Sequence, residues 1–151
     1  MPRYIWSKLN NLQVGKFAEY FVKMELAMYG FLVYCTEVDD REINFVARYG
    51  KGPFVELQVK SLRSFGYVIM HKEKFVPREH LYLALGLLLD GQPPEMFLIP
   101  STAWKNRNGM FVNHDYDGLE SKPEWGLNIS EKNMPLLEPY RFEKIVGRMI
   151  G

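Results

Sequence analysis

Apolar residues near the start of the chain recur at spacings of three and four. Between positions 11 and 29 they are Val14, Phe17, Phe21, Met24 and Met28. This spacing places apolar side chains along one stripe, so it predicts an amphipathic helix over 11–29. Gly30 follows directly, and glycine is typical of the position that ends a helix.

The pattern then changes to that of short β-strands. The runs 31–38, 42–49 and 54–62 are rich in β-branched and aromatic residues, as strands are. The second and third runs are joined by the sequence Gly-Lys-Gly-Pro at 50–53, which is strong turn chemistry. We therefore predict an antiparallel meander over 31–62.

The third of these strands has two different faces. Strand geometry puts alternate residues on opposite sides. One side is apolar and the other polar, so the polar side is either solvated surface or a site. The apolar residues are Val55, Leu57 and Val59, and the polar residues are Glu56, Gln58 and Lys60.

The second half of the chain predicts further strands and a closing helix. After a polar stretch at 63–80, the run 81–89 is apolar throughout, which is typical of a central strand buried on both sides. Ser101 is expected to cap a short helix. The expected elements are the strand 96–100, an irregular or hairpin excursion at 105–124, a short strand at 125–130 and a helix at 138–150 with Pro139 in its first turn. The order α-β-β-β-(α)-β-β-α predicts one α/β domain with a mixed sheet over 1–151.

Composition limits the class of protein. The chain has 151 residues, 47% of them hydrophobic, which is typical of a folded globular protein. Its net charge of +1 means that any basic surface is local. The single cysteine, Cys35, lies in an apolar run and predicts a buried structural thiol rather than a nucleophile. With no signal peptide or membrane-length apolar segment, we expect a cytoplasmic protein and no membrane partner.

The first helix, an acidic turn and the polar strand face together resemble a known family. In order, the chain presents Glu19, then an acidic turn before the second strand, and then Glu56-Leu57-Gln58-Val59-Lys60. This layout resembles the PD-(D/E)xK nuclease superfamily, whose restriction-endonuclease-like fold is shared with archaeal Holliday-junction resolvases. The resemblance spans roughly residues 14–62 and implies an α/β fold with a central mixed sheet flanked by helices.

The resemblance assigns roles residue by residue. Lys60, Gln58 and Glu19 correspond to the catalytic positions, with Gln58-Val59-Lys60 in the Gln-x-Lys form of Mrr-like members. Asn44 falls where the family has a metal-binding Asp, which is a departure from the family pattern. Carboxylates on neighbouring positions can partly replace the missing negative charge. The expected metal ligands are therefore Asn44, Asp40, Glu42 and Glu56.

The implied function is Mg²⁺-dependent DNA cleavage at a site that has lost charge. Hard oxygen ligands hold Mg²⁺ beside a phosphodiester, but the amides of Asn44 and Gln58 carry no charge. We therefore expect weak Mg²⁺ binding and a degenerate nuclease. The alternative is a non-catalytic interaction or scaffold protein with the same fold. In that case the polar face is solvated surface, and Glu19 pairs with Lys23 one helical turn away.

DNA is the expected partner through basic residues that lie close together along the chain. Aromatic residues Tyr67, Phe75 and Tyr82 interleave with them, and clustering of cations on one face is what phosphate binding requires. A solvated basic loop is the competing interpretation, and a homodimer remains open. The candidate nucleic-acid-binding residues are Lys16, Arg63, Lys72, Lys74 and Arg78.

Overall fold

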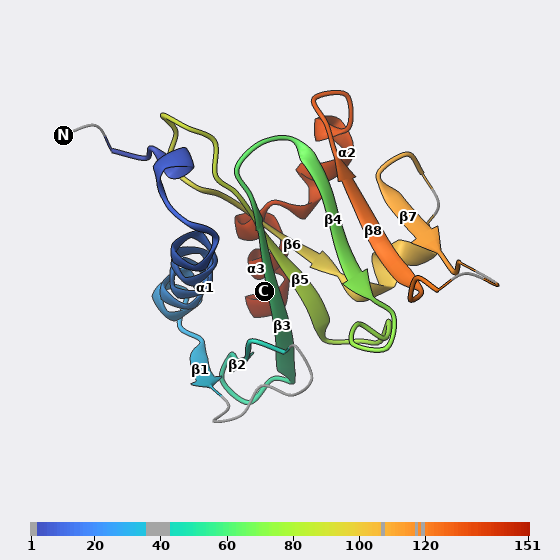
Figure 1. Cartoon of the computed structure of the whole chain (residues 1–151). Coiled ribbons are helices and arrows are strands. Elements are labelled where there is room, and N and C mark those ends of the chain that lie inside the picture. Colours follow the sequence, from blue (N-terminus) through green and yellow to red (C-terminus); the bar gives the residue numbers. More distant parts are fainter. Residues whose placement is uncertain (1–2, 36–42, 107, 117, 119) are drawn as a thin grey trace.

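The computed structural model describes residues 3–35, 43–106, 108–116, 118 and 120–151. A five-stranded sheet of order β1-β2-β3-β5-β6 lies beside a three-stranded sheet of order β4-β8-β7 (Figure 1). The strands are β1 (Leu32–Cys35), β2 (Phe45–Arg48), β3 (Phe54–Leu62), β4 (Gly66–His71), β5 (Leu81–Leu87), β6 (Glu95–Pro100), β7 (Phe111–His114) and β8 (Glu124–Ile129). The helices are η1 (Trp6–Lys8), α1 (Asn11–Met28), η2 (Ser101–Lys105), α2 (Met134–Leu137), η3 (Glu138–Tyr140) and α3 (Phe142–Ile150).

Helix α1 begins and ends where its sequence predicts, but it buries a different stripe. Asn10 and Gln13 form a reciprocal capping box at its start, and Gly30 follows its end with a φ of +97°. The buried positions are Val14, Ala18, Glu19, Val22 and Leu26. Met24 and Met28 of the predicted apolar stripe are 57% and 84% exposed, because the sheet lies against the smaller residues at spacings of four.

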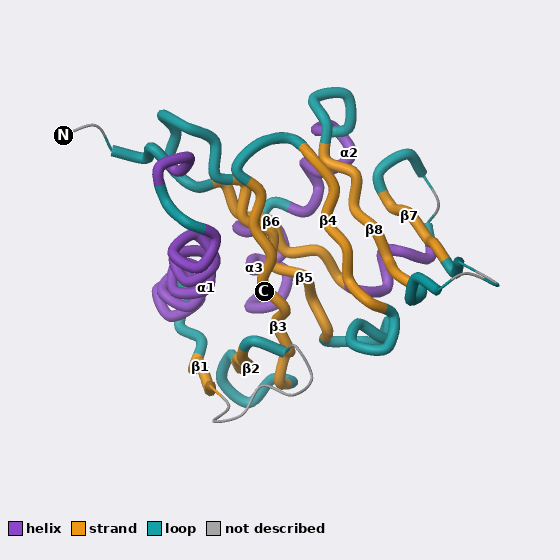
Figure 2. Tube along the Cα trace, in the orientation of Figure 1, coloured by secondary structure: helices purple, strands orange, loops and turns teal. Residues whose placement is uncertain are grey.

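The large sheet is mixed. β1, β2 and β3 form the predicted antiparallel meander, β5 then pairs with β3 in parallel, and β6 pairs with β5 antiparallel. As predicted, β5 is buried on both sides. Leu83 and Leu85 face a core shared with the small sheet, whereas Ala84 faces a core shared with α1 and α3. The two helices therefore cover one face of the large sheet, and the small sheet covers the other (Figure 2).

The small sheet contains the main departure from prediction. Residues 66–71 form strand β4 within a stretch to which we assigned no strand. Val68 and Met70 are buried there, while Tyr67 and Ile69 are more than one-third exposed, which is the alternation of a half-buried strand. The predicted hairpin region does form one, since β7 pairs with β8.

Three local predictions are wrong. Ser101 does not cap η2. Its buried hydroxyl instead accepts from the N–H of Arg78 and donates to the carbonyl of Arg78. The closing helix begins at Phe142 rather than 138, since Arg141 has extended backbone (φ −54°, ψ 140°). Cys35 is exposed, because it ends β1, the edge strand of the sheet. Among the described helices, none is long and apolar enough to cross a membrane.

Candidate functional site

Asn44 joins α1 to β3 at the point where β2 begins. Its backbone N–H donates to the carbonyl of Leu57 at 2.9 Å, and its side-chain oxygen accepts from the N–H of Val59 at 2.7 Å. Its side-chain Nδ2 donates to Oε1 of Glu19 at 3.4 Å. Regular pairing of β2 with β3 starts at Phe45, opposite Leu57. The Asn44 amide thus extends the strand pairing by one hydrogen bond and ties it to the helix.

Glu19 is a nearly buried carboxylate with partners on its own helix. It is 9% exposed, and a buried charge is costly unless it is paired. Lys16 Nζ lies 3.4 Å from one carboxylate oxygen and Lys23 Nζ lies 4.0 Å from the other. The pairing of Glu19 with Lys23 that was weighed as the alternative is therefore present. Together with Asn44, these lysines satisfy the carboxylate.

The polar residues of β3 lie on the side of the large sheet that faces the small sheet. Glu56, Gln58 and Lys60 are in register with Leu81, Leu83 and Leu85 of β5, and these leucines belong to the core between the two sheets. Paired residues of neighbouring strands point to the same side. Glu56, Gln58 and Lys60 therefore share one face, as the alternation predicts, whereas Glu19 reaches β3 from the helix side through Asn44.

The β3 polar residues differ in burial and in partners. Gln58 is 2% exposed, and Lys60 is half-buried. In the part of the chain that the structure describes, Lys60 forms no hydrogen bond or ion pair. Glu56 is held by the guanidinium of Arg78 through contacts of 2.9 and 3.4 Å. Lys60 is thus the residue of this face whose charge is available.

Glu56 and Arg78 also line a groove with basic and acidic walls. The groove has a volume of about 480 Å³, and Lys74 and Glu73 contribute to it together with Ile43. Two of the predicted nucleic-acid-binding residues, Lys74 and Arg78, therefore lie in one groove. This arrangement follows from the turn between β4 and β5, which carries both residues past the start of β3 (Figure 1).

The other basic residues of that set lie elsewhere. Arg63 donates to the carbonyls of Trp6 and Leu9 and to the side chain of Asn11, so it holds the segment before α1 against the end of β3. Lys72 contacts Asp115 and Asn113, and its Nζ lies 4.3 Å from the centre of the Trp125 ring. Lys16 lies on α1 beside Glu19. Of the five candidate residues, Lys74 and Arg78 lie together in the groove, whereas Lys16, Arg63 and Lys72 lie elsewhere.

Comparison with known proteins gives one kind of match. No protein-family model matches the chain, and no curated protein does. Among solved structures, the chain is similar to Hjc, a Holliday junction resolvase from the archaeal hyperthermophile Archaeoglobus fulgidus. The match has a TM-score of 0.55 and 14% sequence identity, and it covers 88% of this chain and 95% of that one. The chain has a restriction-endonuclease-like fold.

Within this restriction-endonuclease-like fold, the described residues by themselves do not form a Mg²⁺ site. Mg²⁺ requires several oxygen ligands in near-octahedral geometry. Of the candidate ligands, Asn44 uses its oxygen on Val59 and Glu56 is paired with Arg78. No group of three potential acidic, histidine or cysteine ligands occurs among the residues described. Asp40 and Glu42 lie outside the described residues.

Sequence reasoning missed two features of this region. It did not pair Glu56 with Arg78, which are 22 positions apart, and it did not identify Asn44 as a hydrogen-bonded link. A signal for the second feature was present. An asparagine side chain can both donate and accept, so an amide at the start of a strand, opposite a buried helix carboxylate, can bridge the two elements.

Proposed function

We propose that this chain is a DNA-binding protein whose nuclease-like site no longer holds Mg²⁺ strongly. The observation that carries the proposal is the donation from Asn44 to Glu19 at 3.4 Å. An aspartate at position 44 has no such donor, and its charge would oppose that of Glu19 unless a cation lay between them. Asparagine allows α1 and β3 to meet without a cation.

The charges around Glu19 support weak metal binding. Among the described residues, one carboxylate faces two lysines of the same helix, so these residues by themselves carry no excess of negative charge to attract a dication. At an effective dielectric constant near 20, a pair of unit charges about 4 Å apart interacts by roughly 4 kcal/mol. Each carboxylate missing relative to the family pattern therefore removes several kcal/mol of gross attraction for Mg²⁺. We expect slow DNA cleavage or none.

The groove beside β3 supports DNA binding. Lys74 and Arg78 line it together with Glu56 and Glu73, and Arg78 is paired with Glu56. Half-buried Lys60 lies further along the same face of β3 and adds a positive charge. Lysines and arginines on one surface attract the phosphate backbone. Because the protein of similar fold is named a Holliday junction resolvase, a four-way DNA junction is the natural first probe.

The second candidate is an interaction protein, and the outer surface of α1 favours it. Tyr20, Met24 and Met28 lie four residues apart along α1 and are 56%, 57% and 84% exposed. Exposed apolar surface of this kind is typical of a protein contact. We propose that a second copy of the chain occupies it, which is the homodimer left open by the sequence.

Binding of a labelled four-way junction and of a matched duplex tests the main proposal. The proposal predicts binding that weakens steeply between about 50 and about 200 mM salt, because neutralised phosphates release counterions. It also predicts no products after long incubation with Mg²⁺ or Mn²⁺. The absence of any DNA binding at low salt would overturn it in favour of the interaction protein. Sedimentation of the wild type and of a Met24→Glu, Met28→Glu variant tests the dimer, which the variant should dissociate.

A further inference from the structure

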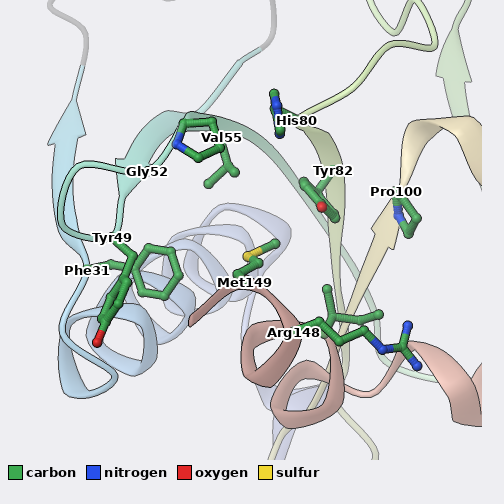
Figure 3. A pocket seen from close by; sticks show the side chains of 11 residues that line it. Phe31, Tyr49, Gly52, Val55, His80, Tyr82, Pro100, Arg148 and Met149 are labelled. Carbon is green, nitrogen blue, oxygen red and sulfur yellow. The ribbon is translucent and has the colours of Figure 1, made fainter. Parts of the chain in front are cut away.

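A second cavity lies on the helix side of the large sheet, away from the Glu19–Asn44 junction. It has a volume of about 280 Å³ and lies where the end of α3 crosses the first residues of β3 and β5 (Figure 3). Val55 lines it, whereas the Asn44 bridge meets β3 at Val59. Four residues of strand span roughly 13 Å. The cavity is therefore separate from the site discussed above.

The walls of this cavity are largely aromatic. Phe31 and Tyr49 form one wall, with ring centres 5.5 Å apart and an angle of 52° between the rings. Tyr82 lies across from them, and Met149 of α3 lies between (Figure 3). Burial raises the pKa of the Tyr82 phenol, so the group stays protonated at neutral pH and can donate a hydrogen bond. Flat aromatic walls favour a flat apolar ligand over a flexible chain.

Arg148 lines the cavity on the opposite side from Phe31 and Tyr49, with its guanidinium directed outward at the rim (Figure 3). Within the described residues, its guanidinium forms no hydrogen bond or ion pair. The contrast with Arg141 is clear, since Arg141 pairs with both Glu138 and Glu95. An arginine without an internal partner at the side of an aromatic cavity can accept a carboxylate or phosphate through two parallel hydrogen bonds.

His80 lies at the mouth of the cavity in an uncommon conformation. Its φ is +68°, a region that costs energy for a residue with a side chain and that persists only when the surroundings fix it. Its carbonyl accepts the N–H of Glu56 at 2.7 Å, which anchors it to β3. His80 lines the cavity on the side of Val55 and Tyr82 (Figure 3), where its ring nitrogens can bond a polar edge of a ligand.

We propose that this cavity binds a planar aromatic compound that carries an anionic group. The ring packs against Met149, with the Phe31–Tyr49 wall on one side and Tyr82 on the other, and the anion contacts Arg148. A cavity of 150 Å³ in another protein binds benzene, and this one is roughly twice as large, so it accommodates two fused rings. Arg148 can bind either a carboxylate or a phosphate. A carboxylate would come from an aromatic acid, and a phosphate would come from a nucleotide. The inference does not depend on DNA binding.

Calorimetric titration with two complete ligands and their halves tests the proposal. The complete ligands are indole-3-carboxylate and deoxyadenosine 5′-monophosphate. The halves of the first are indole and acetate, and those of the second are deoxyadenosine and inorganic phosphate. At least one complete ligand should bind about tenfold more tightly than either of its halves, as expected for one added charge-assisted contact. The complete ligand that binds identifies the source. If neither exceeds its halves, the proposal is overturned.

Variants locate the binding. Arg148→Met keeps an unbranched apolar stem at an exposed position and should weaken the complete ligand about tenfold without changing indole. Lys144→Met removes a cation from the same helix outside the cavity and should change neither. Met149→Trp, at a half-buried position, fills the cavity and should abolish both. Unfolding temperatures confirm that each variant is folded. Unchanged binding in Arg148→Met or in folded Met149→Trp would contradict the proposal.

Discussion

The polar side chains on the two sides of β3 differ in their hydrogen-bond and ion-pair partners. On the helix side, the Glu19 carboxylate is paired with Asn44, Lys16 and Lys23. We call this the closed side, because the polar groups there are paired with one another. On the side facing the small sheet, Glu56 is paired with an exposed arginine and lines a groove. Lys60 on the same side forms no hydrogen bond or ion pair with the residues that the structure describes. Of these two groups of described residues, the one on the side facing the small sheet offers charge to a partner.

Substitution of Gln58 is expected to have the largest effect on stability, because its side chain is only 2% exposed on the side facing the small sheet. Gln58→Glu introduces a charge into the interior. Without metal it should lower the free energy of unfolding by about 2–3 kcal/mol, measured by urea denaturation. Gln92→Glu, at an exposed position, is the control and should change it by less than about 0.5 kcal/mol. Equal stability of the two variants would show that position 58 tolerates an unneutralised carboxylate.

Asn44→Ala tests the closed side. The change removes the acceptor of the Val59 N–H and the donor to Glu19, so it should cost about 1–2 kcal/mol of unfolding free energy. Hydrogen exchange of the Val59 amide should accelerate as well. Asn128→Ala, on exposed strand surface, should change neither quantity. A protected Val59 amide in Asn44→Ala would mean that the side chain does not hold the strand.

The double variant Lys72→Glu, Lys74→Glu tests the groove side, which faces the small sheet, through its affinity for DNA. If this segment contacts phosphates, the double variant should bind duplex and junction DNA more weakly, regardless of sequence. The slope of log affinity against log salt should also fall by about one for each lost contact. The single variant Lys74→Glu separates the groove residue from Lys72, which is already paired with Asp115. Lys132→Glu, in the loop after β8, is the control that should bind as the wild type does.

Local patterns predicted much of the framework. The helix predicted over 11–29 and observed over Asn11–Met28, the three-strand meander and the doubly buried β5 all follow from periodicity and turn residues. Strand β4 was missed because its alternation, with Val68 and Met70 inward, is short and flanked by polar residues. The buried stripe of α1 was misassigned because Ala18 and Val22 are less conspicuous than the larger Met24 and Met28.

The candidate site was less predictable because its contacts are not local. Glu56 and Arg78 meet only when the turn after β4 returns to the start of β3. The aromatic cavity likewise combines Phe31, Tyr82 and Arg148, which are distant in sequence. The polarity of β3 could be read from alternation, but which of its charges would find an internal partner depended on packing between the two sheets.

Titration of Mg²⁺ into the wild type and Asn44→Asp by calorimetry tests the central claim most directly. The single substitution places a second carboxylate beside Glu19 without burying a charge at position 58. The account predicts no measurable binding by the wild type and measurable binding by Asn44→Asp. It also predicts that Mg²⁺ raises the unfolding temperature of the variant alone. Any DNA cleavage that the variant gains should disappear on Lys60→Ala. If the wild type itself binds Mg²⁺ and cuts DNA in a Lys60-dependent way, the proposed loss of the metal site is wrong.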